Sequence, residues 1–141
     1  MVVVDGQGVP LACQITSASP AEVTLIESTL DEIDVQPSVE GDPAPQPERL
    51  IYDRAADSDP LRTRLQEERG IELICPHRKN RKKKATQDGR KLRRYKRRWI
   101  VERTFAWFGN FRRLVVRYER KLSVYKAFFH LACVILTLRQ L

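Results

Sequence analysis

The order of apolar and polar positions predicts an amino-terminal hairpin and a helix. The run VVV at residues 2–4 and the β-rich run PLACQIT at residues 10–16 are separated by DGQG at residues 5–8, which is turn chemistry for a hairpin. Residues 19–33 begin with Ser-Pro, a helix-start signal, and then place apolar residues at steps of three and four. That spacing predicts an amphipathic helix.

The middle of the chain predicts a linker and then a parallel crossover. Residues 35–48 hold four prolines and several acids with nothing to bury, so we interpret them as an acidic, proline-rich linker or insertion. The run LIY at residues 50–52 ends on Asp53, a helix is expected over residues 59–70, and a second strand over residues 71–75. Strand, helix and strand with short links form a crossover unit, which places Asp53 at the carboxyl edge of a strand.

The last third of the chain predicts a basic loop and two helices. The run RKNRKKK at residues 78–84 has no periodicity, whereas the pattern becomes helical from about Lys91. Ser123 is expected to cap a final helix over residues 123–139, which is apolar nearly all round and must pack inside the domain or against a partner. Steps of three and four place five residues on one face of the first helix: Leu92, Tyr95, Trp99, Glu102 and Ala106.

Charge is divided unevenly along the 141 residues. Residues 1–60 carry two basic and twelve acidic side chains (2 − 12 = −10), and residues 61–141 carry twenty-four basic and six acidic ones (24 − 6 = +18). The last apolar run, residues 124–138, is shorter than the roughly 20 residues that a bilayer span needs. The charge asymmetry indicates a polyanionic partner, with nucleic acid as the first candidate. The short apolar run indicates no association with a membrane.

The cysteines indicate neither a zinc site nor a disulfide framework. Cys13, Cys75 and Cys133 stand far apart, with no CxxC pair and with only two histidines in the chain. We interpret them as buried thiols in a reducing cytoplasm, where a nucleoid-associated location would suit a DNA partner.

Glu102 is the one acid in RRWIVERTFAWF, residues 97–108. Seven residues make almost two helical turns, so Tyr95, Arg98 and Glu102 should project from one side of the helix, which is also its apolar side. One interpretation is an Arg98–Glu102 pair at the margin of the core. The other is that Glu102 and Asp53 are carboxylate ligands of divalent metal ions at the edge of the sheet.

Three segments carry a family resemblance: LIYDRAADSDPLRTRL, GIELICPHRKNRKK and RRYKRRWIVERTFAWFGNFRRLVVRYER. Together they resemble the carboxyl part of a bacterial insertion-sequence transposase of the DDE superfamily. The resemblance implies an α/β fold with an RNase H-like mixed sheet, flanking helices and metal-dependent transfer of DNA strands. It covers most of the chain, with the proline-rich linker as the segment particular to this sequence.

The resemblance also implies roles for single residues. Asp53 matches the second acid of the catalytic triad and Glu102 the third, so both are implied as ligands of Mg²⁺ or Mn²⁺. Tyr95 and Arg98 match the family's Tyr-Arg-Glu spacing as supporting residues. The lysine expected seven residues after the glutamate is Gly109 here. The tyrosine of the motif around Asp53 is also replaced, because DRAA stands there.

The first acid of the triad is expected upstream of the hairpin, and Asp5, in the DGQG turn, reads as a turn former. Asp57 and Asp59 read as helix-start residues. We therefore expect residues 1–141 to form a partial DDE domain, incomplete at the amino terminus, whose neighbouring strands lack a central partner or pair directly. Two explanations stay open, a degenerate remnant and a transposase whose opening segment comes from an upstream reading frame.

The basic segment, residues 78–98, is the expected contact with double-stranded DNA at element ends and target. A homo-oligomer is expected when the protein is active, because two DNA ends must be brought together. The alternatives are a noncatalytic nucleic-acid-binding protein and a nuclease of the same core. Trp99, Phe105, Trp107 and Phe108 are interpreted as core. The expected phosphate-binding residues are Arg78, Lys79, Arg81, Lys82, Lys83, Lys84, Arg94, Arg97, Arg112 and Arg113.

Overall fold

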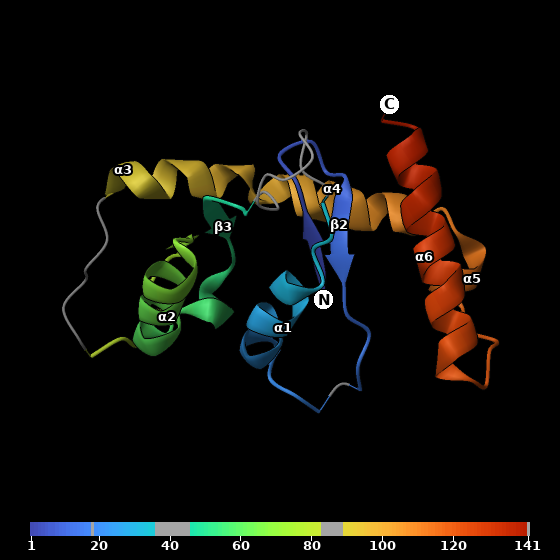
Figure 1. The fold of residues 1–141 in the computed structure, drawn as a ribbon, viewed down its shortest axis with the longest axis horizontal. Coiled ribbons are helices and arrows are strands. Elements are labelled where there is room, and N and C mark those ends of the chain that lie inside the picture. The colour runs from blue at the N-terminus through green and yellow to red at the C-terminus, as the bar shows by residue number, and fades with distance from the viewer. Residues whose placement is uncertain (18, 36–45, 83–88, 141) are drawn as a thin grey trace, which may run out of the picture. The chain divides into compact units, whose positions relative to one another are not determined.

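The computed structural model describes residues 1–17, 19–35, 46–82 and 89–140, which Figure 1 draws in colour. The chain divides into two compact units. The first comprises Met1–Pro20, Leu25–Ile33 and Trp99–Leu141, and the second comprises Ala21–Thr24 and Asp34–Arg98. Most of the expected linker lies outside the described residues, as do Lys83 and Lys84 of the basic segment.

The predicted hairpin opens the first unit. Strand β1 (Val2–Val4) pairs antiparallel with β2 (Pro10–Cys13). Asp5 shapes the turn, because its Oδ1 atom accepts the backbone N–H groups of Gln7 at 2.8 Å and Val9 at 2.9 Å. Its role as a turn former is confirmed.

The helix predicted over residues 19–33 is shorter and less regular than its pattern suggests. A 3₁₀ helix, η1 (Glu22–Leu25), precedes α1 (Ile26–Asp31), and Ile26 and Leu30 are buried. Thr29 is also buried, with its hydroxyl donating to the carbonyl of Leu25 at 2.6 Å. The helix therefore begins later than the Ser-Pro signal indicated.

Helix α4 (Trp99–Phe108) packs with a different face from the predicted one. Ile100, Thr104 and Phe108 are buried, whereas Trp99 is 52% exposed and Glu102 is exposed. The apolar face proposed through Glu102 is therefore wrong. Apolar residues occupy most positions of this helix, so their spacing could not identify the side that meets the hairpin.

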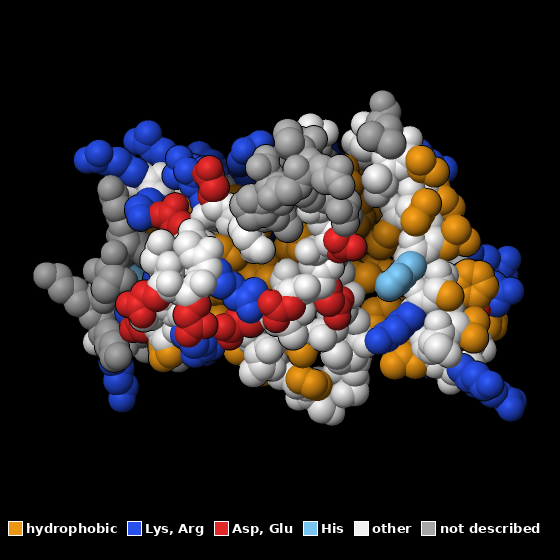
Figure 2. All heavy atoms as spheres, viewed as in Figure 1, with side chains coloured by type: hydrophobic (Ala, Val, Ile, Leu, Met, Phe, Trp, Pro, Cys, Tyr) orange, Lys and Arg blue, Asp and Glu red, His pale blue; other side chains and the backbone are white. Residues whose placement is uncertain are grey.

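Helix α5 (Arg112–Val115) is short, and α6 (Leu122–Leu138) is only partly covered. Ala132 and Leu136 are buried and contact Phe108, but other large apolar side chains of α6 are exposed, as Figure 2 shows. Within the first unit only one side of the expected helix over residues 123–139 is covered, and packing of its other side against a partner stays a prediction. Ser123 lies inside the helix, and Lys121 occupies the cap position without a side-chain hydrogen bond.

The second unit contains the predicted parallel crossover. Strand β3 (Arg49–Ile51) pairs parallel with β4 (Glu72–Ile74), and α2 (Asp59–Arg69) connects them. The hydroxyl of Ser58 caps α2, and Gly70 ends it at a φ of 67°, in the left-handed region that glycine tolerates. The N-cap of α2 is thus Ser58, and the helix begins at Asp59 as predicted.

Two short helices complete the second unit. Helix α3 (Gly89–Leu92) leads into the 3₁₀ helix η3 (Arg93–Arg98), and both carry much of the basic segment. The unit is held by buried side chains from α2 and β4, with their flanking residues: Leu61, Leu65, Ile71, Leu73, Ile74 and Cys75.

The fold class is mixed α and β. Within the described residues the strands form two separate two-stranded sheets, one antiparallel and one parallel, and not a single mixed sheet. None of the helices described is both long enough and apolar enough to cross a bilayer.

Two of the cysteines contact each other although they stand far apart in the sequence, and all three are free thiols. Cys13 on β2 hydrogen-bonds with Cys133 on α6, and its Sγ atom lies 3.5 Å from Nε2 of His130. Both thiols are only half-buried, and Cys75 alone is buried. The contact with Cys133 lowers the pKa of Cys13 to about 6, burial opposes the shift, and His130 adds to it.

Candidate functional site

Asp53 stands at the carboxyl end of β3, as predicted. Pairing with β4 extends one residue beyond the strand, because the N–H of Tyr52 donates to the carbonyl of Ile74 at 3.0 Å. Asp53 then caps the 3₁₀ helix η2 (Arg54–Ala56), with Oδ1 accepting the N–H of Ala55 at 2.8 Å. Its side chain remains 41% exposed. This edge of a parallel pair is where α/β proteins place ligands.

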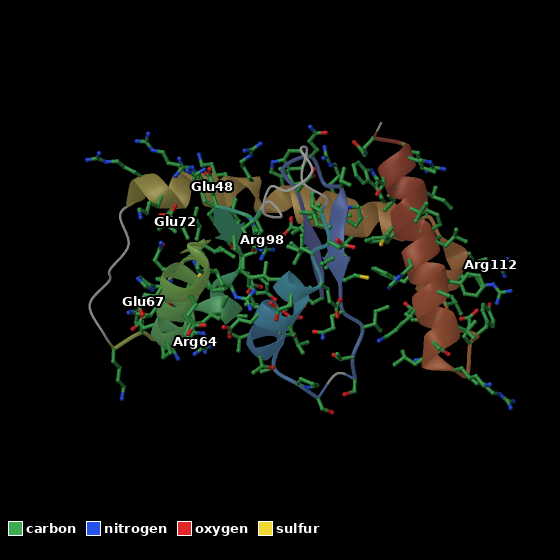
Figure 3. All side chains as sticks on the ribbon, viewed as in Figure 1. Glu48, Arg64, Glu67, Glu72, Arg98 and Arg112 are labelled. Atoms are coloured by element: carbon green, nitrogen blue, oxygen red, sulfur yellow. The ribbon has the colours of Figure 1, made fainter. Side chains whose placement is uncertain are left out.

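Arg98 reaches Asp53. One guanidinium nitrogen lies 3.6 Å from Oδ2 of Asp53, and the two side chains are 35% and 41% exposed. Figure 3 labels Arg98 among the side chains of the structure. At this exposure the pair contributes at most about 1 kcal/mol to stability. The structure therefore brings Arg98, an expected supporting residue, into contact with Asp53, an expected metal ligand.

Glu102 belongs to the first unit, whereas Asp53 and Tyr95 belong to the second. Glu102 is exposed on α4, and Tyr95 is half-buried on η3. The described residues contain no group of three or more His, Cys, Asp or Glu side chains arranged for a metal ion. The accessible carboxylate of Asp53 nevertheless has the oxygen donors that Mg²⁺ or Mn²⁺ prefers.

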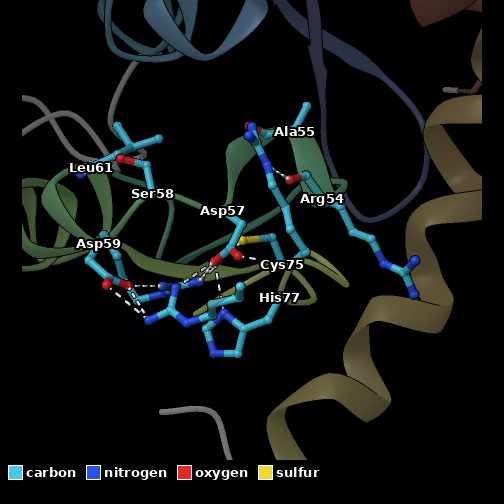
Figure 4. A network of polar contacts seen from close by, with 11 residues as sticks. Arg54, Ala55, Asp57, Ser58, Asp59, Leu61, Cys75 and His77 are labelled. Atoms are coloured by element: carbon cyan, nitrogen blue, oxygen red, sulfur yellow. Dashed lines mark hydrogen bonds and ion pairs between the residues drawn. The ribbon is translucent and has the colours of Figure 1, made fainter. Parts of the chain in front are cut away.

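A polar network surrounds Asp57, four residues after Asp53, and is shown in Figure 4. The side chain of Asp57 is 2% exposed and contacts Nδ1 of His77 at 2.8 Å. It also accepts the backbone N–H of Arg78 at 2.8 Å and lies 3.3 Å from Arg81 and 3.6 Å from Arg62. The prediction of a helix-start role is therefore wrong, because Asp57 binds segments distant in sequence.

The partners of Asp57 stabilise its charged form. Burial acts to raise the pKa of this carboxyl, but the N–H of Arg78, His77 and the Arg81 guanidinium together hold its pKa below the ordinary value of 3.8. A carboxylate this deeply buried is kept charged by its partners.

Arg81 is engaged within the protein. Its Nη2 atom lies 2.9 Å from both carboxylate oxygens of Asp59, which also pairs with Arg62 at 3.3 Å, and the Arg81 side chain is 13% exposed. The buried Nε atoms of Arg62 and Arg81 have no hydrogen-bond partner among the described residues. Of the expected DNA contacts, Arg81 is thus the one most enclosed by acids.

The remaining described DNA-contact candidates lie at the surface. Figure 2 shows Lys and Arg side chains gathered over α3. Arg113 pairs with Glu119 at 3.0 Å. Within the basic segment, Lys91 contacts Glu72 and lowers the pKa of that glutamate. The exposed candidates are Arg78, Lys79, Lys82, Arg94, Arg97, Arg112 and Arg113.

Arg103 makes contacts that the sequence pattern did not predict. Its guanidinium lies between the rings of Trp99 and Trp107, 4.7 Å from each centroid, and donates to the carbonyl of Gln7. The spacing of four residues on either side could have indicated the stack. The expectation of a core role is wrong for Trp99 and for Phe105, which is 51% exposed, and holds for the buried Phe108.

Comparisons with known proteins give consistent results. The sequence pattern of the family described as "Transposase DDE domain" matches residues 1–137. A Burkholderia cepacia protein named as a transposase for insertion sequence element IS402 is 37% identical over 132 residues, or 94% of this chain. The chain spans 58% of the length of that relative. No solved structure matches the chain at a significant level.

Proposed function

Since the chain belongs to the family of transposase DDE domains of bacterial insertion sequences, we propose that it acts in DNA transposition. The proposed reaction is metal-dependent cleavage and transfer of DNA strands at the ends of an insertion sequence. The relative's name and the division of charge along the chain both support DNA as the partner.

The proposed architecture is an RNase H-like core over residues 1–141, in which β3 and β4 contribute parallel strands. Residues 35–48 act as a linker or insertion, and residues 78–98 approach DNA. The parallel register of Leu50 with Leu73 and the crossover through α2 support this proposal, because such units place functional side chains at their carboxyl edge.

In the proposed site, Asp53 and Glu102 hold a divalent metal ion, Mg²⁺ or Mn²⁺. Once bound, such an ion stabilises charge on the attacking and leaving oxygens of a phosphodiester. The N–H of Ala55 orients the carboxylate of Asp53, and Arg98 partly neutralises it. Exposed basic residues of the 78–98 segment bind phosphates and hold the strand beside this edge.

One observation carries the proposal. Asp53 is an accessible carboxylate at the carboxyl end of a parallel strand, with its orientation set by a backbone hydrogen bond. A structural acid would be expected to be enclosed by its partners, as Asp57 is. The exposure of Asp53 therefore favours a ligand role.

The test is nicking of supercoiled DNA with Mn²⁺ or Mg²⁺ by the chain together with an upstream segment that supplies the first acid of the triad. Asp53→Asn and Glu102→Gln should each lower nicking by at least about 100-fold, as expected when an acid that holds the metal is lost. Glu67→Gln, an exposed acid of α2 labelled in Figure 3, is the matched control and should retain activity. DNA binding without metal-dependent nicking would instead favour the noncatalytic alternative.

We also propose that the active form is an oligomer, because transposition joins two ends of an element. The exposed apolar residues of α6 would suit a covered surface in such an assembly. Sedimentation with and without DNA carrying element ends would measure it.

A further inference from the structure

Asp57 connects three separate segments of the second unit. It lies in the turn that follows β3, and its partners come from α2 and from the segment after β4. Arg62 belongs to α2, while His77, Arg78 and Arg81 follow β4. With a side chain only 2% exposed, Asp57 offers no open oxygen to DNA. Any influence on a reaction must therefore pass through its partners.

A continuous path of hydrogen bonds leads from Asp57 to Asp53. Oδ2 of Asp57 accepts the backbone N–H of Arg78 at 2.8 Å. The guanidinium of Arg78 donates to the carbonyls of Arg54 at 3.1 Å and Ala55 at 2.8 Å. The N–H of Ala55 then donates to Oδ1 of Asp53 at 2.8 Å. Every link lies within the second unit, and Figure 4 shows the Asp57 end of the path.

We propose that Asp57 is a positioning residue: through Arg78 it holds the Arg54–Ala56 turn in the conformation that orients the carboxylate of Asp53. The inference rests on the proposed function of Asp53 as a metal ligand. The inference also gives Arg78 a role in holding this turn. Because its guanidinium donates to the turn, Arg78 has fewer donors left for a DNA phosphate.

The arrangement of the network supports positioning as well as stability. Arg62 and Arg81 surround Asp57 from α2 and the following segment, so this half of the network ties the unit together. The half through Arg78 is different, because Arg78 is exposed and its guanidinium donates to two backbone carbonyls of the turn. Outer-shell hydrogen-bond partners of a ligand residue commonly set its orientation in this way.

The test compares two variants with a matched control in the full chain. Asp57→Asn removes the negative charge at the start of the hydrogen-bond path. Arg78→Lys keeps the positive charge but loses the two guanidinium donors that bind the carbonyls of the turn. Asp59→Asn is the control, because Asp59 pairs with the same two arginines as Asp57 while the path through Arg78 begins at Asp57. Circular dichroism establishes that each variant is folded.

The first readout is amide hydrogen exchange at Ala55, which needs no metal. Asp57→Asn and Arg78→Lys should each raise the exchange rate about tenfold, corresponding to a weakened hydrogen bond. Asp59→Asn should leave the rate close to that of the parent. An unchanged rate in a folded Asp57→Asn or Arg78→Lys variant overturns the proposal. Should Asp57→Asn not fold, Arg78→Lys decides the question alone.

The second readout is Mn²⁺ affinity, measured by the electron paramagnetic resonance of free Mn²⁺. Both test variants should bind Mn²⁺ about tenfold more weakly, and the control should not. Asp53→Asn is measured in parallel to separate the two proposals. If it binds Mn²⁺ as the parent does, the metal site is wrong, and exchange at Ala55 still decides whether Asp57 positions the turn.

Discussion

Asp57 is a buried carboxylate that contacts a histidine and two arginines from other segments. Removing one partner from such a network leaves uncompensated charge, so its members are interdependent. Its four-residue separation from Asp53 gave no hint of this role, because the partners approach from α2 and from beyond β4. Single residues of this kind become interpretable only when the tertiary contacts are known.

The network makes a specific contribution to acid stability. Because the pKa of Asp57 is lower in the folded protein than its ordinary 3.8, this group adds stability that is present above pH 3.8. That contribution is lost as the pH falls through the folded-state pKa. Asp57→Asn should therefore show a shallower loss of melting temperature between about pH 5 and pH 2 than the parent. Identical slopes in a thermal melt series would contradict this.

Cys13 should react at an unusually low pH. Its contact with Cys133, assisted by His130, lowers its pKa to about 6, and the thiolate is the reactive form. Alkylation of Cys13 by iodoacetamide, followed by peptide mass spectrometry, should reach half its maximal rate near pH 6. Cys133 should require a more alkaline solution, since its pKa is raised by Cys13 and by burial. Half-maximal alkylation of Cys13 above about pH 8, as for a free thiol, would show that this contact is absent.

At the scale of elements, the hairpin turn is joined to α4 at Gly8. The hydroxyl of Thr104 donates to the carbonyl of Gly8 at 2.8 Å. A Cβ atom at Gly8 would lie 2.9 Å from that hydroxyl, and the residue has a φ of 93°. Both the close approach and the left-handed backbone require glycine.

Gly8→Ala should therefore destabilise the protein by about 1–3 kcal/mol, the cost of strained backbone with an added close contact. Urea unfolding measures the difference. Gly89→Ala is a suitable control, because among the described residues nothing lies within 4 Å of the Cβ that it adds. Equal stability of the Gly8 and Gly89 variants would contradict the packing of the turn on α4.

The elements differ in how well their sequence predicts them. The hairpin and the β3–α2–β4 crossover are correctly predicted, because turn residues, a capped helix and short links are local signals. The side on which α4 packs is not correctly predicted, because this helix is apolar on several sides and only long-range contacts select among them. Asp53 was placed correctly at its strand end for the same local reasons, whereas the Arg98–Asp53 contact depends on tertiary structure.

At the scale of the whole molecule, charge asymmetry indicates which part of the chain we expect to bind DNA. The carboxyl-terminal portion carries the excess of positive charge, but the structure divides its basic residues into two kinds. Arg81 is enclosed by Asp57 and Asp59, while Lys79 and Lys82 are exposed. Net charge alone therefore overstates the number of phosphate contacts that the segment can make.

Lys82→Glu should weaken DNA binding and reduce the slope of log affinity against log salt by about 0.9, the value for one lost phosphate contact. Lys126→Glu, an exposed lysine on α6 with the same change of charge, is the control. Fluorescence anisotropy across a salt series measures both slopes. Equal effects of the two variants would show that DNA responds to total charge and not to the basic segment.

We propose that Asp53, of the second unit, and Glu102, of the first, hold the same metal ion. Mn²⁺ affinity in a double-mutant cycle with Asp53→Asn and Glu102→Gln tests it most directly. We expect each single substitution to weaken binding strongly and the double variant to bind little worse than either single one. Unchanged affinity in either single variant, or effects that simply add, would contradict a shared site.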